Sequence, residues 1–160
     1  MNKSYSLPND FNPGINAEAK AALDKMFIAA QAEGCSMHVA SGFRSYNTQK
    51  KLYENYVKRD GVKGADRYSA RPGHSEHQTG LAFDINSANM GFADTNEAKW
   101  LAANSYKYGF ILRYPEGKEN VTGYKFEPWH YRYIGIDNAQ KLFKSGLTIE
   151  EYFGLTSVYS

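Results

Sequence analysis

The sequence predicts an α+β fold, a small antiparallel sheet flanked by helices. Amphipathic segments with helical spacing, and short apolar runs separated by turn residues, support this prediction. The chain has 160 residues, 42% of them hydrophobic, which fits one domain with its own core. We therefore expect a single domain over residues 1–160, in which the turn-rich residues 1–15 form an N-terminal arm on the surface.

The first helix is expected to follow Asn16, a residue type that caps helix N-termini. Gly34 stands where a helix-ending glycine belongs. Between them, apolar residues recur at the spacing of one helical face: Leu23, Met26, Phe27 and Ala30.

Residues 36–41, SMHVAS, alternate in polarity and predict a half-buried strand that ends at Gly42. On this strand His38 lies on the polar face and is not a metal ligand. Residues 47–58 carry an apolar stripe with helical spacing, and Asn47 is the expected cap of this second helix. The intervening letters GFRS form a strand-to-helix turn, from which side chains project out of a rigid frame.

Residues 59–79 are rich in glycine and polar side chains and predict a long loop, a feature that is usually functional or disordered in a compact domain. The short apolar run LAFDI at 81–85 predicts a strand. Residues 95–109 predict a further helix, capped near Thr95.

The last third of the chain predicts more sheet and one more helix. Thr148 and Glu151 have the spacing of a capping box at the start of residues 148–154. A small antiparallel meander is expected from three short runs, residues 110–114, 123–126 and 129–134.

Composition excludes several classes of function. The formal charge of +2 gives no support for a nucleic-acid partner. Cys35 is the one cysteine, so neither an internal disulfide nor a cysteine-based zinc site can form. No apolar run reaches the roughly 20 residues of a membrane span, and the first residues lack the apolar region of a signal peptide. We expect a monomer without a transmembrane segment.

Two histidines and an aspartate form a candidate zinc site. The glycine turn at Gly80 would let His77 in the loop face Asp84 on the following strand. His130, far along the chain, adds a second imidazole and leaves a fourth position for water. The residues alone leave two alternatives open, namely His74 as a ligand in place of His77 and an Asp84 that caps a turn.

Glu127 stands three residues before His130, and on a regular strand the two side chains would point to opposite faces. Pro128 resolves this conflict, because proline suits the first residue of a strand or a bulge. Glu127 would then lie before the strand, near the metal's water. Zinc lowers the pKa of such a water toward about 7, so a nearby glutamate can take its proton.

Three motifs, in the same order, resemble those of the VanY-type zinc D-alanyl-D-alanine carboxypeptidases, whose superfamily includes lysostaphin and the Hedgehog signalling domain. SEHQTGLAFD resembles the family's Ser-x-His-x-x-Gly-x-Ala-x-Asp motif, and EPWHYRY resembles its Glu-x-x-His element. SGFRSYNTQ resembles its Ser-Gly-aromatic-Arg-Ser turn with a following glutamine. The likeness runs from about residue 16 to 152 and implies a Hedgehog/DD-peptidase-like fold.

The resemblance implies that zinc is bound by His77, Asp84 and His130, and that Glu127 is the general base. It leaves His74 without a ligand role.

The resemblance also implies substrate contacts. Arg44 would hold the substrate's terminal carboxylate or the peptide carbonyl, because its planar fork can donate two parallel hydrogen bonds. Gln49 and Ser75 would add polar contacts. Tyr114, at the end of a strand-like run, is a further candidate for the pocket wall, with core packing as its alternative.

The function implied is removal of the C-terminal D-alanine from peptidoglycan stem peptides. The enzyme would act as an L,D-carboxypeptidase on the tetrapeptide or as a D,D-carboxypeptidase on the pentapeptide. It would work on the cell-wall side of the membrane, exported by a segment absent from this chain. The alternatives are an endolysin-like peptidoglycan endopeptidase and a non-catalytic zinc-containing binding module. Arg44 beside Ser75 favours a carboxypeptidase, and Glu127 argues against a binding module, since a structural metal site needs no base.

Overall fold

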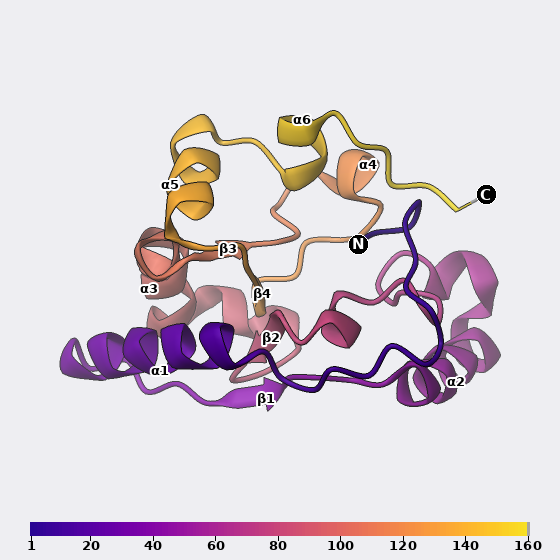
Figure 1. Cartoon of the computed structure of the whole chain (residues 1–160), viewed down its shortest axis with the longest axis horizontal. Helices are drawn as coiled ribbons and strands as arrows, with labels where there is room; N and C mark the ends of the chain where they lie inside the picture. Colours follow the sequence, from indigo (N-terminus) through magenta and orange to yellow (C-terminus); the bar gives the residue numbers. More distant parts are fainter. Residues whose placement is uncertain (160) are drawn as a thin grey trace.

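The computed structural model describes residues 1–159 and confirms the α+β fold, in which helices surround a small antiparallel sheet (Figure 1). The strands are β1 (Val39–Ser41), β2 (Ala82–Ile85), β3 (Phe110–Leu112) and β4 (His130–Tyr133), in the order β1-β2-β4-β3. The expected single domain of residues 1–160 stays a prediction, and its last residue, Ser160, lies outside the described residues. No helix among residues 1–159 has the length and apolarity needed to cross a bilayer.

Strand register brings distant residues of the candidate site together. Asp84 on β2 pairs with His130 on β4, and Ser41 on β1 pairs with Asp84 from the other side. Directly paired residues project to the same face of a sheet. The side chains of Asp84 and His130 therefore leave the sheet on one side, while Phe83 and Ile85 of β2 belong to the main core on the other.

The helix α1 (Ala17–Ala32) begins and ends as predicted. The Asn16 side chain accepts a hydrogen bond from the Ala19 amide, and Gly34 follows the helix with a φ of 81°. The apolar stripe of α1 belongs to the main core, which includes Leu23, Met26, Phe83, Leu101 and Phe110.

The second helix is longer than expected. The helix α2 (Tyr46–Ala65) is capped by Ser45, whose side chain accepts from the Thr48 amide, so the expected cap at Asn47 was wrong. The helical path breaks at Gly61, which has a φ of 72°, and resumes to Ala65. The predicted loop 59–79 was therefore wrong at both ends, because its last residues also form the 3-10 helix η1 (Glu76–Thr79).

The edge strand β1 differs from the half-buried strand predicted for residues 36–41. It has three residues and pairs with β2 alone, and Val39 is exposed on it. Burial along β1 does not alternate, so the alternation in the sequence did not become alternation in burial. His38 is exposed, in keeping with a place outside the site.

Thr95 caps α3 (Asn96–Asn104) as expected, and the 3-10 helix η3 (Ser105–Tyr108) completes the predicted segment. The 3-10 helix η2 (Met90–Asp94) precedes it.

The predicted three-strand meander was wrong. Residues 123–126 form no strand, and β4 lies between β2 and β3. The backbone of residues 123–127 forms hydrogen bonds outside the sheet. The Lys125 amide donates to the Arg67 carbonyl, and the Glu127 amide donates to the Tyr114 carbonyl. A short helix, α4 (Glu119–Thr122), precedes this segment.

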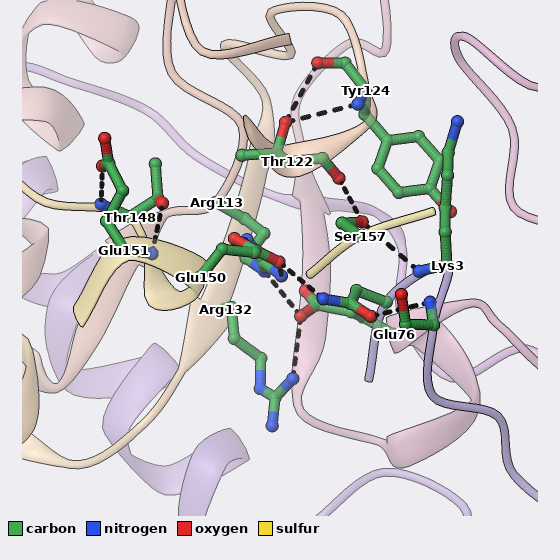
Figure 2. Close-up of polar contacts among 12 residues, drawn as sticks. Lys3, Glu76, Arg113, Thr122, Tyr124, Arg132, Thr148, Glu150, Glu151 and Ser157 are labelled. Carbon is green, nitrogen blue, oxygen red and sulfur yellow. Dashed lines mark hydrogen bonds and ion pairs between the residues drawn. The ribbon is translucent and has the colours of Figure 1, made fainter. Parts of the chain in front are cut away.

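Two helices follow the sheet, α5 (Ile136–Ser145), which was not predicted, and α6 (Ile149–Phe153). The capping box of Thr148 and Glu151 is present at the start of α6 (Figure 2). The N-terminal residues lie against the C-terminal segment, since the Asn2 amide donates to the Glu150 carboxylate and to the Thr156 carbonyl.

Candidate metal centre and its pocket

His77 in η1, Asp84 in β2 and His130 at the start of β4 converge in the structure. One potential ligand atom from each lies within 4.8 Å of the others, and all three side chains are buried. His74, the alternative ligand, lies elsewhere, with its Nδ1 3.1 Å from the Asn2 carbonyl oxygen. The three residues expected from the sequence thus form a cluster that could hold a metal ion.

The environment of His77 fixes which ring nitrogen faces the cluster. Its Nδ1 lies 2.7 Å from the Gly42 carbonyl oxygen, which can only accept a hydrogen bond, so Nδ1 carries a proton. The lone pair of a neutral ring then resides on Nε2, which lies 3.2 Å from Asp84 Oδ1. Ser75 supports this placement, because its hydroxyl oxygen accepts from the His77 amide at 3.3 Å.

The ring of His130 has the opposite orientation. Its Nε2 lies 3.2 Å from Glu76 Oε2, while Nδ1 lies 3.4 Å from Asp84 Oδ1 and 3.3 Å from Glu127 Oε2. Because an ionised carboxylate only accepts, Nε2 carries the proton toward Glu76. In a neutral ring the lone pair then lies on Nδ1, which faces Asp84 and Glu127 and is the nitrogen that a metal could bind.

Glu127 precedes β4, and residues 128–129 form a turn between it and His130. The His130 amide donates to the Glu127 carbonyl across this turn at 3.2 Å. The backbone is thus not extended here, and both side chains reach the same side, as the argument from Pro128 anticipated. Glu127 is buried beside the cluster, and its role as a base stays a prediction.

Carboxylates surround the His130 ring and shift its protonation. Burial raises the pKa of the Glu127 carboxyl above its ordinary value. Burial also opposes the charged form of His130, but Glu127, Glu76 and Asp84 outweigh this effect and raise the pKa of His130 to about 10. Asp84 Oδ1 is buried without a hydrogen-bond partner among residues 1–159. An orphaned carboxylate oxygen between two imidazoles fits a site for a cation.

Arg44 lies at the edge of the cluster, with Nη2 3.8 Å from Asp84 Oδ2. Nη1 donates to Gln49 Oε1 at 2.8 Å, and Nη2 donates to Ser41 Oγ at 2.9 Å. Gln49 is buried, and its own amide nitrogen donates to the Ala70 carbonyl at 2.7 Å. The protein therefore engages both ends of the Gln49 amide, which fixes the guanidinium of Arg44.

One pocket of about 500 Å³ is lined by the candidate ligands and by the residues beside them: His77, Asp84, His130, Glu127, Arg44 and Gln49. Tyr114 lines the wall of this pocket, with its ring centroid 4.8 Å from that of His130. Its side chain is also buried, so the pocket wall and buried packing, the two alternatives for this residue, are both found. The pocket continues outward along polar and aromatic side chains: Tyr56, Arg59, Tyr68, Lys125 and Trp129.

Sequence reasoning missed Glu76, although this residue lies inside the quoted motif. Its carboxylate is almost completely buried and accepts from Arg113 Nε at 2.7 Å and from Arg132 Nη1 at 2.9 Å. Burial disfavours its charge, but the two guanidinium groups outweigh burial and hold the pKa of Glu76 well below its ordinary value. The position of Glu76 next to the candidate ligand His77 was a signal in the sequence. Its partners could not be read there, because Arg132 lies on β4 and Arg113 directly after β3.

Comparison with known proteins agrees with this geometry. The sequence model of the VanY D-alanyl-D-alanine carboxypeptidase family matches residues 12–136. A D-alanyl-D-alanine carboxypeptidase of Enterococcus faecalis is 42% identical over 147 residues, which cover 86% of this chain and 55% of the relative. The chain spans between 45% and 65% of the length of the curated relatives it matches.

Two solved structures are similar over almost the whole chain. The LdcB LD-carboxypeptidase superimposes with a TM-score of 0.90 and 49% identity, covering 99% of this chain and 87% of that one. A VanY D,D-pentapeptidase variant from a VanB-type resistance cassette, solved in complex with Zn(II), gives a TM-score of 0.83 and 37% identity, covering 96% of both chains. This chain belongs to the VanY D-alanyl-D-alanine carboxypeptidase family.

Proposed function

We propose that this chain is a zinc-dependent L,D-carboxypeptidase that removes the C-terminal D-alanine from peptidoglycan tetrapeptide stems. The observation that carries the proposal is one pocket that holds the cluster of His77, Asp84 and His130 together with Glu127 and Arg44. A peptidase that hydrolyses the last peptide bond needs a metal centre, a base and a group that recognises a free carboxylate, and these residue types supply all three.

In this proposal the metal ligands are His77 Nε2, His130 Nδ1 and a carboxylate oxygen of Asp84. Two imidazoles and one carboxylate with an open position suit zinc. The orphaned Asp84 oxygen and the two ring nitrogens supply donor atoms for such an ion. When bound, zinc supplies a Lewis acid for a water molecule and for the scissile carbonyl group.

Glu127 is the general base in this proposal. It takes a proton from the attacking water and returns it to the nitrogen of the departing D-alanine as the carbon–nitrogen bond breaks. Burial raises the pKa of Glu127, and a higher pKa makes a carboxylate a stronger base. Its Oε2 lies 3.3 Å from His130 Nδ1, so it is next to the proposed position of the metal.

Arg44 recognises the terminal carboxylate of the substrate. Its contacts with Gln49 and Ser41 use some of its N–H donors and fix the plane of the guanidinium. We assign Gln49 the task of holding Arg44, with its substrate contact made through that arginine. Ser75 and Tyr114 line the pocket beside the metal ligands.

We base the proposed L,D-specificity on the sequence identities between this chain and two solved structures. The LdcB LD-carboxypeptidase is 49% identical to this chain, whereas the D,D-pentapeptidase is 37% identical. Two further structures of DacB from Streptococcus pneumoniae, one of them described as an L,D-carboxypeptidase, are 49% and 48% identical. We propose action on the cell-wall side of the membrane, where such stems are found, and a monomeric enzyme.

Mass spectrometry of muropeptides tests this function. Tetrapeptide and pentapeptide stems are incubated together with the zinc-loaded protein, with a chelator-treated sample as control. We expect loss of one alanine mass from the tetrapeptide and not from the pentapeptide. Shortening of the pentapeptide alone would make the protein a D,D-carboxypeptidase, and cleavage inside cross-linked stems would make it an endopeptidase. If neither stem changes while zinc is bound, the carboxypeptidase function is wrong.

A further inference from the structure

The second ring nitrogen of each histidine in the cluster has a different kind of partner. His77 Nδ1 lies against a backbone carbonyl, that of Gly42, at 2.7 Å. His130 Nε2 lies against a side-chain carboxylate, that of Glu76, at 3.2 Å. A carboxylate partner increases the basicity of an imidazole more than a neutral carbonyl does, because it stabilises a partial positive charge on the ring.

The position of Glu76 is set by charges that belong to neither the metal cluster nor the pocket. Oε1 accepts from Arg113 and from Arg132 (Figure 2). This leaves Oε2 for His130. Glu76 and Arg113 are each almost completely buried. Rotation of this carboxylate away from His130 would leave buried charges without partners, which is strongly unfavourable.

Arg113 is in turn fixed by α6. Its Nη1 donates to Glu150 Oε2 at 2.9 Å and its Nη2 to Glu150 Oε1 at 2.6 Å, a two-pronged contact between buried groups. Asn2 donates to the same carboxylate at 3.0 Å. Figure 2 shows Arg113 between Glu150 and Glu76, with Arg132 reaching Glu76 separately. Two carboxylates and two guanidinium groups balance in charge, so the network can remain buried and rigid.

We propose that Glu76 is a positioning residue that holds the Nε2–H tautomer of His130 and thereby directs Nδ1 to the metal, with Arg113 and Glu150 holding Glu76 in place. The inference rests on the proposed metal centre but not on the identity of the substrate. It assigns a role in metal binding to a charge network whose outer members, Glu150 and Asn2, touch none of the three proposed ligands.

Metal affinity distinguishes this role from simple support of the fold. We expect Glu76→Gln to weaken zinc binding about 10- to 100-fold in competition with a chelating indicator, the usual size of effect for a lost partner of a ligand histidine. Glu151→Gln is the matched control, because it also removes one paired carboxylate on α6, the partner of Lys118, but Glu151 contacts neither Glu76 nor Arg113. It should lower the melting temperature and keep zinc affinity close to that of the wild type.

Nitrogen-15 NMR of the histidine rings gives a second measurement that needs no variant. In the zinc-loaded wild type, the proposal requires a protonated Nε2 and a metal-bound Nδ1 on His130, with the reverse assignment on His77. Metal binding by Nε2 of His130 would overturn the inference even if Glu76→Gln failed to fold. So would unchanged zinc affinity in Glu76→Gln, or an equal loss in Glu151→Gln. Failure of the wild type to bind zinc would overturn the proposed function as well, so the two failures are distinguishable.

Discussion

Three carboxyl groups surround His130, and each has a different electrostatic environment. Glu76 is neutralised by Arg113 and Arg132, and its pKa is held well below the ordinary value against the effect of burial. At Asp84 burial favours a higher pKa, but the nearby His77, His130 and Arg44 outweigh burial, and the pKa of Asp84 lies below its ordinary value. For Glu127 burial prevails and the pKa is raised. The surroundings therefore separate one residue type into a partner for His130, a candidate ligand and a candidate base.

Replacing Glu127 by glutamine tests the base. The amide cannot accept a proton from water at neutral pH, so we expect the turnover number for the tetrapeptide to fall about 100- to 10,000-fold. Zinc stoichiometry should stay at the wild-type value, because Glu127 is not one of the three proposed ligands. Steady-state kinetics and metal analysis of the same sample measure both. The matched control, Glu116→Gln, changes an exposed carboxylate outside the pocket, and turnover near the wild-type rate by Glu127→Gln would refute the assignment.

Replacing Arg44 by lysine tests carboxylate recognition. Lysine keeps the charge but loses the planar fork, so we expect kcat/KM for the tetrapeptide to fall about 10-fold or more, from the loss of roughly 1.5–3 kcal/mol in charged hydrogen bonds. A tetrapeptide with a C-terminal amide should be a poor substrate for the wild type and should lose little more in the variant. Arg67→Lys, an exposed change at the ion pair with Glu119, is the control. Equal losses on the free acid and the amide would contradict the proposed role.

At the scale of elements, η1 directs neighbouring side chains to different partners. Glu76 meets Arg113 and His130, while His77 meets Gly42 and Asp84. A 3-10 turn advances three residues per turn, so neighbours project in different directions. Gly80 ends this turn with a φ of 74° and lies close to the chain at Gly14.

Gly80→Ala should therefore destabilise the protein strongly. A Cβ atom at Gly80 would lie 2.1 Å from the Gly14 carbonyl oxygen, in addition to the strain of a positive φ. We expect a loss of more than about 2 kcal/mol in the free energy of unfolding, measured by urea denaturation. Gly34→Ala is the control, since its φ is 81° and nothing lies within 4 Å of an added Cβ. Similar losses in the two variants would show that the contact with Gly14 is unimportant.

The start of α2 offers a second test at this scale. Ser45 accepts from the Thr48 amide, so Ser45→Ala should cost about 1 kcal/mol of stability. Asn47, the cap expected from the sequence, lies inside the helix and is exposed, so Asn47→Ala should cost nothing. Thermal unfolding of the two variants compares them directly, and a larger loss for Asn47→Ala would restore the expected cap.

At the scale of the molecule, the terminal segments and the metal cluster are connected by side chains. Asn2 contacts Glu150, Glu150 pairs with Arg113, and Arg113 pairs with Glu76 beside His130. The main core lies on the other face of the sheet, built from α1, β2, β3 and α3. The cluster and the core thus use opposite faces of β2.

Removal of the metal should lower the thermal stability of the protein without changing its secondary structure. We expect a chelator to abolish turnover and leave the far-UV circular dichroism at 25 °C unchanged, because the core remains packed. The melting temperature should fall, since binding to the folded state alone contributes about 4 kcal/mol when free zinc exceeds its Kd a thousandfold. Added zinc should restore both turnover and melting temperature. Unfolding on chelation would show that the metal is required for the fold.

The sequence by itself determined the fold class and the elements whose signals are local. Asn16 and Thr95 cap helices as expected, and Thr148 and Glu151 form a capping box, because such contacts join residues three apart. The resemblance of three sequence motifs to the VanY-type family also identified His77, Asp84, Glu127 and His130, which the structure brings together, and Pro128 explained how Glu127 reaches the same side as His130.

Only the tertiary structure decided which groups orient that cluster and where the sheet ends. The pairing of Asp84 with His130, and the contacts of Glu76 with Arg113 and Arg132, join residues 37 to 56 positions apart. Periodicity carries no information about such contacts. Residues 123–126 have the composition of a strand, but the Lys125 amide donates to the carbonyl of Arg67, which lies in a turn. Long-range packing and buried charge pairs, which no local pattern encodes, set the geometry in which the proposed chemistry takes place.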